Sequence, residues 1–486
     1  MASFLSWNCR GIGSKFEDIK ALVNASHPVC VALQETFLKP NNYLKLRGFS
    51  CVRKDNDSGV STSGGVCIFT SNLYPSTTIN LHTSLQAVAV QVHFRTLVTI
   101  CCIYLPPSDI ISQDDLNILV DQLPAPFILL GDFNGHGTLW GSDSTNSRGR
   151  QIEQFISDNC LCLLNNDEKT YFHEPTRTFH SLDLAIFSPE LLPMLNFAVG
   201  SDLCNSDHFP LIISPVDSSS VTSCPQTYLF QRADLAEFTR RAVITEAMIS
   251  PDSITDAVQN VIDCIICAAD ATIPKRSPLP RKFRKPWWNE VCREAYKKQR
   301  KLWGIFRRYP TTENLIAFKR ARATARRVRR RSQRESWIKY ISSITSTISS
   351  AQLWKKVKAA NGIYTEFAFP ILKTGTISHS SPSDIANVIG QAFADVSSRD
   401  SYCPVFLAKK KQAERLNLQF RTRRHFPYSR DFQMFELKRA LSLTRSTCPG
   451  PDGITYNMLR HLDESSLLHL LRLFNRMWSE QLFPIQ

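Results

Sequence analysis

The chain has 486 residues, of which 43% are hydrophobic, and carries a formal net charge of +15. This apolar content is ordinary for a globular protein and allows sizeable cores. No apolar run approaches the roughly 20 residues of a membrane span, and no signal peptide opens the chain. The 15 cysteines are too sparse for a disulfide scaffold. These features exclude a membrane-spanning or disulfide-rich secreted protein, and we expect an intracellular protein with reduced thiols.

Residues 1–215 alternate short apolar runs with turn signals, a pattern typical of an α+β domain. Buried strands are predicted at 3–8, 29–34, 64–70, 86–94, 97–104, 127–131, 182–187 and 209–213. Helices are predicted near 16–25 and 148–159, where apolar residues recur at helical spacing. The segment has the length of a single domain.

The rest of the chain is mostly helical by its pattern. A polar linker begins at Val216, and a helical segment spans 231–273. A long basic helix or helix pair is predicted from 287 to about 348. Shorter helices are predicted within 351–395, 432–443 and 456–481. We therefore divide the chain into four parts, with bounds at 1–215, 216–286, 287–350 and 351–486.

The charges are unevenly distributed along the chain. Residues 1–215 hold 13 Lys and Arg against 20 Asp and Glu, whereas residues 216–486 hold 45 against 23. Residues 281–339 alone carry 21 basic side chains and 4 acidic ones. The basic part predicts a polyanion as partner, most simply nucleic acid.

Polar residues stand at or near the ends of the predicted strands. They are Asn8, Glu35, Asp132, Asn134, Asp183, Asp207 and His208. Taken alone, Gly131–Gly135 has the composition of a turn, and Ser206–His208 that of a loop or a helix cap. An unpaired charge is costly to bury, however, so carboxylates seldom occupy such positions by chance. If these strand ends converge, they form one acidic pocket with a histidine, which suits a hard divalent cation and a phosphate.

Taken together, these seven polar residues favour phosphodiester hydrolysis. That reaction needs a metal, a base that positions water, and stabilisation of the leaving oxygen. Carboxylates such as Glu35 and Asp207 suit Mg²⁺. Asp132, with the asparagine two residues later, can orient and deprotonate a water. His208 can hold a phosphate oxygen, while a partner such as Asp183 would fix its tautomer and raise its pKa.

Six segments carry a resemblance to the endonuclease/exonuclease/phosphatase superfamily. They are Ser6–Gly11, Gln34–Thr36, Ile103–Pro107, Gly131–Asn134, Ser147–Gly149 and Ser206–His208. Together they are most similar to the apurinic/apyrimidinic-type endonuclease of non-LTR retrotransposons, and Gly135–Gly141 points to Jockey-like elements of arthropods. The resemblance implies a two-sheet α/β sandwich with its site at the strand ends. It also implies Mg²⁺ as cofactor, with Mn²⁺ as a substitute.

The resemblance assigns roles to individual residues. The implied metal ligands are Asn8, Glu35 and Asp207. The implied catalytic residues are Asp132, Asn134, His208, Asp183 and Tyr104. Tyr104 would contact the scissile phosphate, whereas Thr170 and Arg148 would support the nucleic-acid backbone.

The second half resembles the same elements. Trp287-Trp288-Asn289 ahead of a dense basic helix resembles their linker. Ser446–Ile454 resembles the opening of a retroelement reverse transcriptase, although it also reads as a Gly/Pro turn ahead of a helix. We interpret residues 351–486 as an incomplete, fingers-like reverse-transcriptase start, and the open reading frame as truncated. The palm aspartates of a polymerase are absent from the sequence, so polymerase activity is not expected.

An arginine run stands in the basic helical part. Its members are Arg326, Arg327, Arg329, Arg330 and Arg331. They predict an electrostatic clamp on DNA or on element RNA, or else a solvated charged helix. Trp288, Trp303 and Trp337 would stack on bases or pack in a core.

The sequence as a whole predicts a Mg²⁺-dependent DNA endonuclease that nicks target DNA for target-primed reverse transcription of a non-LTR retrotransposon. Two alternatives stay open, namely a catalytically silent nucleic-acid-binding relic and another phosphodiesterase of the superfamily, acting on phospholipid or inositol phosphate. Target DNA is the expected partner, and the nucleus the expected place of action. No membrane and no obligate protein partner are expected.

Overall fold

The structure is a computed structural model. It describes residues 3–42, 44–56, 63–192, 194–216, 228–275, 285–345, 348–360, 371–375, 377–415, 430–444, 449–450, 452–480 and 482. The chain forms two compact units, one of Met1–Val221 with Arg281–Ser397 and one of Thr222–Pro280 with Ser398–Gln486. The four-part division expected from the sequence stays a prediction.

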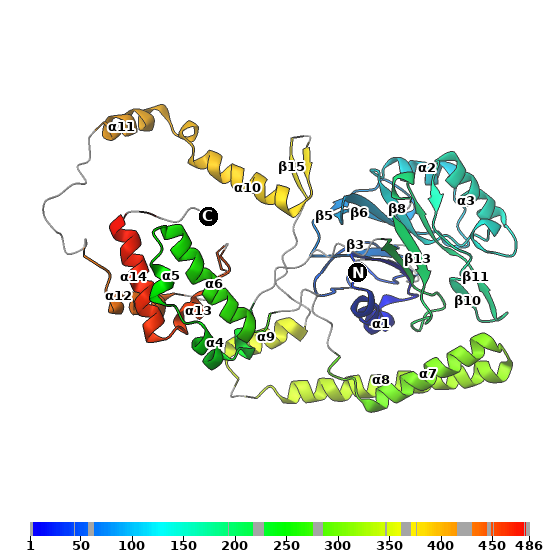
Figure 1. The fold of residues 1–486 in the computed structure, drawn as a ribbon. Helices are drawn as coiled ribbons and strands as arrows, with labels where there is room; N and C mark the ends of the chain where they lie inside the picture. The colour runs from blue at the N-terminus through cyan, green and yellow to red at the C-terminus, as the bar shows by residue number, and fades with distance from the viewer. Residues whose placement is uncertain are drawn as a thin grey trace. The chain divides into compact units, whose positions relative to one another are not determined.

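Two six-stranded sheets make up the sandwich, by which we mean residues 3–216 of the first unit (Figure 1). The first sheet has the order β13 (Leu195–Val199), β14 (Leu211–Pro215), β1 (Phe4–Asn8), β2 (Cys30–Gln34), β4 (Val66–Ser71) and β3 (Phe49–Lys54). The second has the order β5 (Ser76–Ile79), β6 (Gln86–His93), β7 (Leu97–Tyr104), β8 (Phe127–Asp132), β12 (Asp183–Phe187) and β9 (Cys162–Leu163). A separate hairpin joins β10 (Tyr171–His173) to β11 (Thr178–His180). The predicted α+β two-sheet sandwich is confirmed.

Each sheet has one parallel pair near its centre. β1 and β2 are parallel and are connected through α1 (Ile12–Ser26), while β7 and β8 are parallel and are connected through α2 (Gln113–Asp121). A parallel pair needs such a crossover, and both of its strands end at the same edge of the sheet. The pairing registers place Asn8 beside Gln34 and Tyr104 beside Asp132. The polar residues that follow these strands are therefore delivered to one edge.

Three layers of apolar side chains hold the sandwich together. One fills the space between the sheets and includes Phe4, Ile100 and Leu130. A second lies between the second sheet and the helices α2 and α3 (Ser147–Asp158), and a third packs α1 on the first sheet. Single 3₁₀ turns occur at Thr138–Trp140 and Pro189–Leu191. The eight strands expected from the sequence are all present, with bounds shifted by a few residues.

The basic part of the first unit contains a helical hairpin. It consists of α7 (Glu290–Arg308) and α8 (Thr312–Ser342), which pack side by side. Both helices begin at a side-chain cap, since Asn289 accepts a hydrogen bond from the Cys292 N–H and Thr311 from the Asn314 N–H. The unit continues with α9 (Ser350–Ala360), β15 (Leu372–Thr374), β16 (Ile377–His379) and α10 (Pro382–Ser397). A 3₁₀ turn at Arg399–Ser401 already belongs to the second unit.

The second unit is helical. Its members are α4 (Leu235–Arg241), α5 (Glu246–Ile249), α6 (Ile254–Thr272), α11 (Pro404–Glu414), α12 (Met434–Leu443), α13 (Tyr456–Arg460) and α14 (Glu464–Glu480), with a 3₁₀ turn at Phe230–Arg232. Its core combines Val261 and Ile265 of α6 with Leu467 and Leu470 of α14. The segment that resembles a reverse-transcriptase opening lies partly outside the described residues. No helix in the described ranges is both long and apolar enough to cross a membrane.

Gly131 permits the close approach of β7 and β8 just before Asp132. It pairs with Ile103, and a Cβ at Gly131 would lie 1.9 Å from the Ile103 carbonyl oxygen. We expect Gly131→Ala to lower the free energy of unfolding by about 1–3 kcal/mol, because the strand must move. Urea denaturation measures the loss. In Gly13→Ala, whose added Cβ meets nothing within 4 Å, no loss is expected, and equal losses in both variants would contradict the argument.

Candidate active site

Residues at the ends of strands from both sheets meet in one pocket. Asn8, the last residue of β1, donates from Nδ2 to Glu35 Oε1 at 2.9 Å and to Asp132 Oδ2 at 2.8 Å. Glu35 directly follows β2, and Asp132 is the last residue of β8. A single amide thus connects carboxylates of two different sheets. Asn8 and Asp132 are both almost completely buried.

The turn after β8 is held by its own polar groups. The N–H of Asn134 donates to Asp132 Oδ1 at 3.1 Å, and Asn134 Nδ2 donates to the Leu105 carbonyl at 3.1 Å. Asn134 has a φ of 49° and Glu35 a φ of 48°. Positive φ values are uncommon for residues other than glycine, and such backbone strain is concentrated at functional sites. Tyr104 lies at the same edge, where burial, followed by the charges of Glu35 and Asp132, raises the pKa of its hydroxyl.

His208 and Asp183 form a buried pair beside Asp132. The His208 Nδ1 lies 2.8 Å from Asp183 Oδ2, and its Nε2 lies 3.8 Å from Asp132 Oδ2. Burial alone would lower the pKa of His208, but the carboxylates of Asp183 and Asp132 outweigh it and raise that pKa to about 10. The imidazole is therefore held as a cation, with one nitrogen committed to Asp183. Burial in turn raises the pKa of Asp132, which the His208 charge opposes.

The loop that carries Asp207 and His208 is attached to β1. The Trp7 indole donates to the His208 carbonyl at 3.0 Å, and the Ser206 hydroxyl donates to the Asn8 carbonyl at 2.8 Å. Asp207 forms an ion pair with Arg10, two residues after Asn8. Asp207 therefore lies at the mouth of the pocket rather than at its buried centre, and has a cationic partner there.

Two residues expected to support nucleic acid have internal hydrogen bonds. The hydroxyl of Thr170 is buried and accepts from the N–H groups of Leu182 and Asp183, both at 3.0 Å. Thr170 thus positions the start of β12. Arg148, on α3, donates to the Asp109 carbonyl at 2.5 Å and is half-buried. Their contact with nucleic acid stays a prediction.

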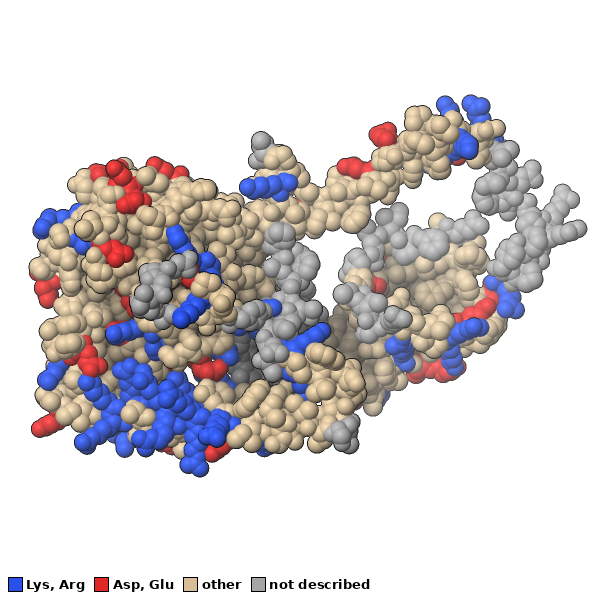
Figure 2. All heavy atoms as spheres, turned by 180° about the vertical axis from the view of Figure 1, so that it is seen from behind, with Lys and Arg blue, Asp and Glu red and all other residues tan. Residues whose placement is uncertain are grey.

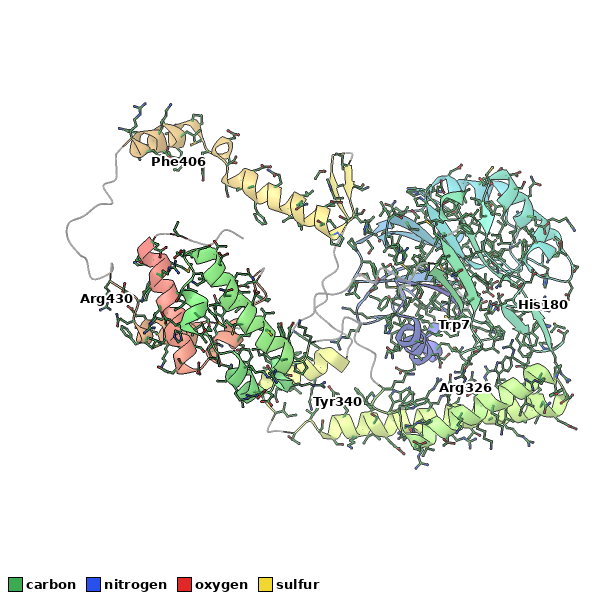
Figure 3. All side chains as sticks on the ribbon, viewed as in Figure 1. Trp7, His180, Arg326, Tyr340, Phe406 and Arg430 are labelled. Carbon is green, nitrogen blue, oxygen red and sulfur yellow. The ribbon has the colours of Figure 1, made fainter. Side chains whose placement is uncertain are left out.

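The five arginines of the basic run point in different directions on α8. Arg327, Arg330 and Arg331 are exposed, and Arg331 pairs with Glu335 of the same helix. Arg329 donates to Asp18 of α1 at 3.1 Å. Arg326 is half-buried and lies on the side of α8 that faces the sandwich (Figure 3). If these arginines bind nucleic acid, as predicted, they would do so from different surfaces of α8.

Sequence reasoning assigned no role to three residues near the site. The ring of Tyr171 lies 4.6 Å from that of His208, and Arg10 pairs with Asp207. Lys15 is buried and donates to the carbonyls of Cys9 and Arg10. The sequence did hold a signal for Arg10. It is one of the few basic residues in the first half of the chain, and it lies two residues after Asn8, where a predicted strand ends. Tyr171 gave no such signal.

The residues present suit a hard divalent cation. A carboxylate oxygen of Asp132, one of Asp183 and a ring nitrogen of His208 lie within 4.8 Å of one another. The two carboxylates, rather than the protonated imidazole, are the donors that a cation would use. Asp183 Oδ1 is buried without a hydrogen-bond partner in the part of the chain that the structure describes. With Glu35 nearby, carboxylate oxygens predominate, and these are the ligands that Mg²⁺ prefers. A bound cation would also offset the cost of the buried Asp132 charge.

The His208 pair predicts a pH-dependent stability. Histidine has an ordinary pKa of about 6.5, whereas that of His208 is raised to about 10. The ion pair with Asp183 therefore stabilises the protein fully below about pH 6.5, and its contribution is lost as the pH rises through about 10. In EDTA, we expect Asp183→Asn to unfold at a lower temperature than the wild type near pH 7, and this difference to shrink towards pH 10. A difference that stays constant with pH would contradict the assignment.

Comparisons with known proteins show similarity to proteins of transposable elements over most of the chain. Residues 98–212 match the family described as endonuclease-reverse transcriptase. The chain is 25% identical over 502 residues to a Drosophila melanogaster protein named for the RNA-directed DNA polymerase of transposon BS, an alignment that covers 99% of this chain and 54% of that protein. It is 28% identical over 211 residues to the RNA-directed DNA polymerase from mobile element jockey of the same organism, covering 42% of this chain and 23% of that protein.

The chain is related to the polyproteins of jockey-like non-LTR retrotransposons. It spans about half the length of the curated relatives that match nearly all of it, 54% of one and 53% of another. The endonuclease domain of TRAS1, a telomere-specific non-LTR retrotransposon, is similar with a TM-score of 0.38 and 19% identity, over 45% of this chain and 100% of that one. Of the pocket residues, Tyr104, Asp132, Asp183 and His208 lie within the family match, and Asn8 lies before it.

Proposed function

We propose that the sandwich is a Mg²⁺-dependent DNA endonuclease. It would nick one strand of target DNA and leave a 3′ hydroxyl for target-primed reverse transcription. The observation that carries this proposal is the single pocket in which Asn8 bridges Glu35 and Asp132 while Asp183 holds His208. The relatives named as RNA-directed DNA polymerases support the retrotransposon setting.

Asn8, Glu35 and Asp207 would hold the cation, which polarises the phosphodiester and stabilises the leaving oxygen when bound. Asp132 would accept the proton of the attacking water, for which its raised pKa makes it a better base. Asn134, fixed by its bonds to Asp132 and Leu105, would orient that water.

His208 would bind a non-bridging oxygen of the phosphate. Because its Nδ1 is committed to Asp183, only Nε2 is left for the substrate. A cationic imidazole stabilises the charge that develops on phosphate oxygens. Tyr104 keeps its hydroxyl protonated, since its pKa is raised, and can donate to a second phosphate oxygen. The sandwich's Thr170 and Arg148, with the arginines of α8, would contribute to binding the nucleic-acid backbone.

The test is relaxation of supercoiled plasmid by the purified full chain, with Mg²⁺, with Mn²⁺ and with EDTA. We expect open circles with either metal and none in EDTA. Folded protein that binds plasmid without nicking it would instead favour a silent nucleic-acid-binding protein. Release of phosphate from inositol phosphates, or of a phosphorylated head group from phospholipids, without nicking, would favour another hydrolase of the same superfamily.

A further inference from the structure

The α7–α8 hairpin packs directly against the sandwich, next to the candidate active site. The contact is an apolar cluster of Phe172, Leu203, Phe209, Trp303, Phe306, Leu315 and Phe318. The Phe172 ring centroid lies 5.6 Å from those of both Trp303 and Phe306. Phe172 follows Tyr171 in β10, and Phe209 directly follows His208. The hairpin therefore supports the two segments that form this side of the pocket.

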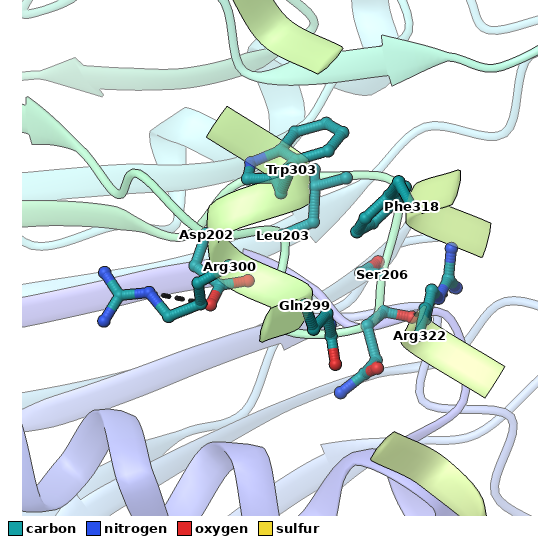
Figure 4. Close-up of a pocket in the computed structure, with 9 residues that line it drawn as sticks. Asp202, Leu203, Ser206, Gln299, Arg300, Trp303, Phe318 and Arg322 are labelled. Atoms are coloured by element: carbon teal, nitrogen blue, oxygen red, sulfur yellow. Dashed lines mark hydrogen bonds and ion pairs between the residues drawn. The ribbon is translucent and has the colours of Figure 1, made fainter. Parts of the chain in front are cut away.

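Polar contacts fix the hairpin at several points along its length. The hydroxyl of Tyr296 on α7 donates to Asp202 at 2.9 Å, and the Trp303 indole donates to the Ser201 carbonyl at 3.3 Å. On α8, Arg322 donates to the Asn205 carbonyl at 3.2 Å. Figure 4 shows Trp303, Phe318 and Arg322 around the loop that contains Leu203 and Ser206. Both helices are thus anchored to the loop that leads to Asp207.

A cleft of about 530 Å³ lies between α8 and the sandwich. Arg10, Lys15, Tyr171 and Asp207 line it from the sandwich, and Phe318, Arg322 and Arg326 line it from α8. Asp207 precedes His208, and the Tyr171 ring lies 4.6 Å from the His208 ring at a tilt, so the cleft borders the candidate active site. One wall of this cleft therefore belongs to the basic hairpin.

The cleft carries more positive than negative charge. Four cations line it against two carboxylates, Glu174 and Asp207, and Asp207 is already paired with Arg10. Burial, and then the charges of Arg326 and Arg322, lower the pKa of Lys15. The Arg322 Nε is buried without a hydrogen-bond partner within the described ranges. An anion in the cleft would relieve this repulsion and satisfy that donor.

Apart from Arg329, which pairs with Asp18, the arginines named in the basic run and in the cleft fall into two groups. Arg322 and Arg326 face the cleft, while Arg327, Arg330 and Arg331 face solvent. Figure 2 shows Lys and Arg side chains gathered over the part of the molecule that α7 and α8 form. The outward-facing group suits non-specific attraction of any polyanion. The cleft-facing group is placed to contact a backbone that reaches the active site.

We propose that α8 forms one wall of the endonuclease's substrate cleft, and that Arg322 and Arg326 contact phosphates of the DNA strand next to the site of the nick. This rests on the proposed function, which makes DNA the molecule that must enter the pocket. The cleft borders the site at which DNA would be nicked, so the molecule that occupies it is expected to be the DNA substrate rather than RNA. Arg322 is pre-positioned by its bond to Asn205, and Arg326 completes the row one helical turn later.

The experiment measures the binding of a fluorescein-labelled duplex by the full chain in EDTA, at several salt concentrations. We expect Arg326→Ala to weaken binding about 3- to 10-fold and to reduce the salt slope by about 1, as for the loss of one phosphate contact. Arg326→Lys should restore most of the affinity. Arg320→Ala, an exposed arginine of the same helix that does not line the cleft, should bind like the wild type.

Equal affinity and salt slope for Arg326→Ala and Arg320→Ala would overturn the proposal. So would a defect of Arg326→Ala for an RNA hairpin of equal length but not for the duplex. Because binding is measured without metal, these outcomes do not depend on nicking. A wild-type chain that binds DNA through Arg326 but never nicks would instead contradict the proposed function alone.

Discussion

Asp132→Ala is expected to abolish nicking by the full chain, with a loss of at least about 10³-fold, while DNA binding is retained. A single catalytic group that acts on a proton contributes about 10²–10⁴-fold, and Asp132 also fixes Asn8 and the turn to Asn134. DNA binding should persist because the cationic residues Arg322 and Arg326 lie on another element. The measurement is the initial rate of open-circle formation, together with the affinity for a labelled duplex.

The matched control is Asp121→Ala, an exposed aspartate at the end of α2. It should nick at the wild-type rate. Asp132→Asn separates charge from shape, because it keeps the volume of the side chain but cannot accept the water's proton. Nicking by Asp132→Asn at the wild-type rate would refute the role of Asp132 as base.

Phe306→Ala is expected to release the hairpin from the sandwich. Phe306 is fully buried and contacts the rings of Phe172 and Trp303. Truncation of a buried phenylalanine costs about 3–5 kcal/mol. Here the lost contact with Phe172 joins the hairpin to β10. We therefore expect a lower unfolding temperature, faster proteolysis within 285–345, and weaker nicking.

Ile305→Ala is the control for Phe306→Ala, because Ile305 is adjacent on α7 but 36% exposed. Its effect on stability should stay below about 1 kcal/mol. Equal proteolysis of the two variants would contradict the docking of the hairpin. Normal nicking by a chain whose hairpin is released would show that the sandwich alone positions Asp207 and His208.

The strands that carry the candidate site were the easiest to predict from the sequence. β1, β2, β8 and β12 are completely buried, so their sequences are nearly continuous apolar runs. A buried polar residue without a partner is costly, so the polar residues at the ends of such runs were expected to have partners. The prediction that they converge follows from this cost. Both parallel pairs then bring them to a common edge.

The strands that were missed are short or exposed at the edges of the sheets. β9 has two residues, β10 and β11 have three each, and no residue of β5 is buried. β3 and β13, also at sheet edges, mix polar and apolar residues without a clear alternation. The helix α2 was missed as well, although its capping box of Ser112 and Asp115 is a recognisable start signal. Pairing with neighbours, not local pattern, stabilises such strands.

The docking of the hairpin could not be predicted from the sequence. Phe172 and Leu203 lie outside the strands and helices predicted from the sequence, and Phe209 begins a predicted strand, so only the tertiary structure brings the three together with α7 and α8. The alternative that Trp303 packs in a core is confirmed, since its side chain is 5% exposed. Trp288 and Trp337 are 36% and 52% exposed, which leaves them accessible to a ligand.

The second unit has a consequence for how the chain is made on the ribosome. Its core joins α6 to α14, but the rest of the chain between them belongs largely to the first unit. At about 5–20 residues per second, α14 emerges roughly 10–40 s after α6. During that interval α6 can pack against α4 and α5, which precede it, but its contacts with α14 cannot yet form. The core of the second unit is therefore completed only late in synthesis, whereas the sandwich, made from one continuous segment, can fold as soon as it has been synthesised.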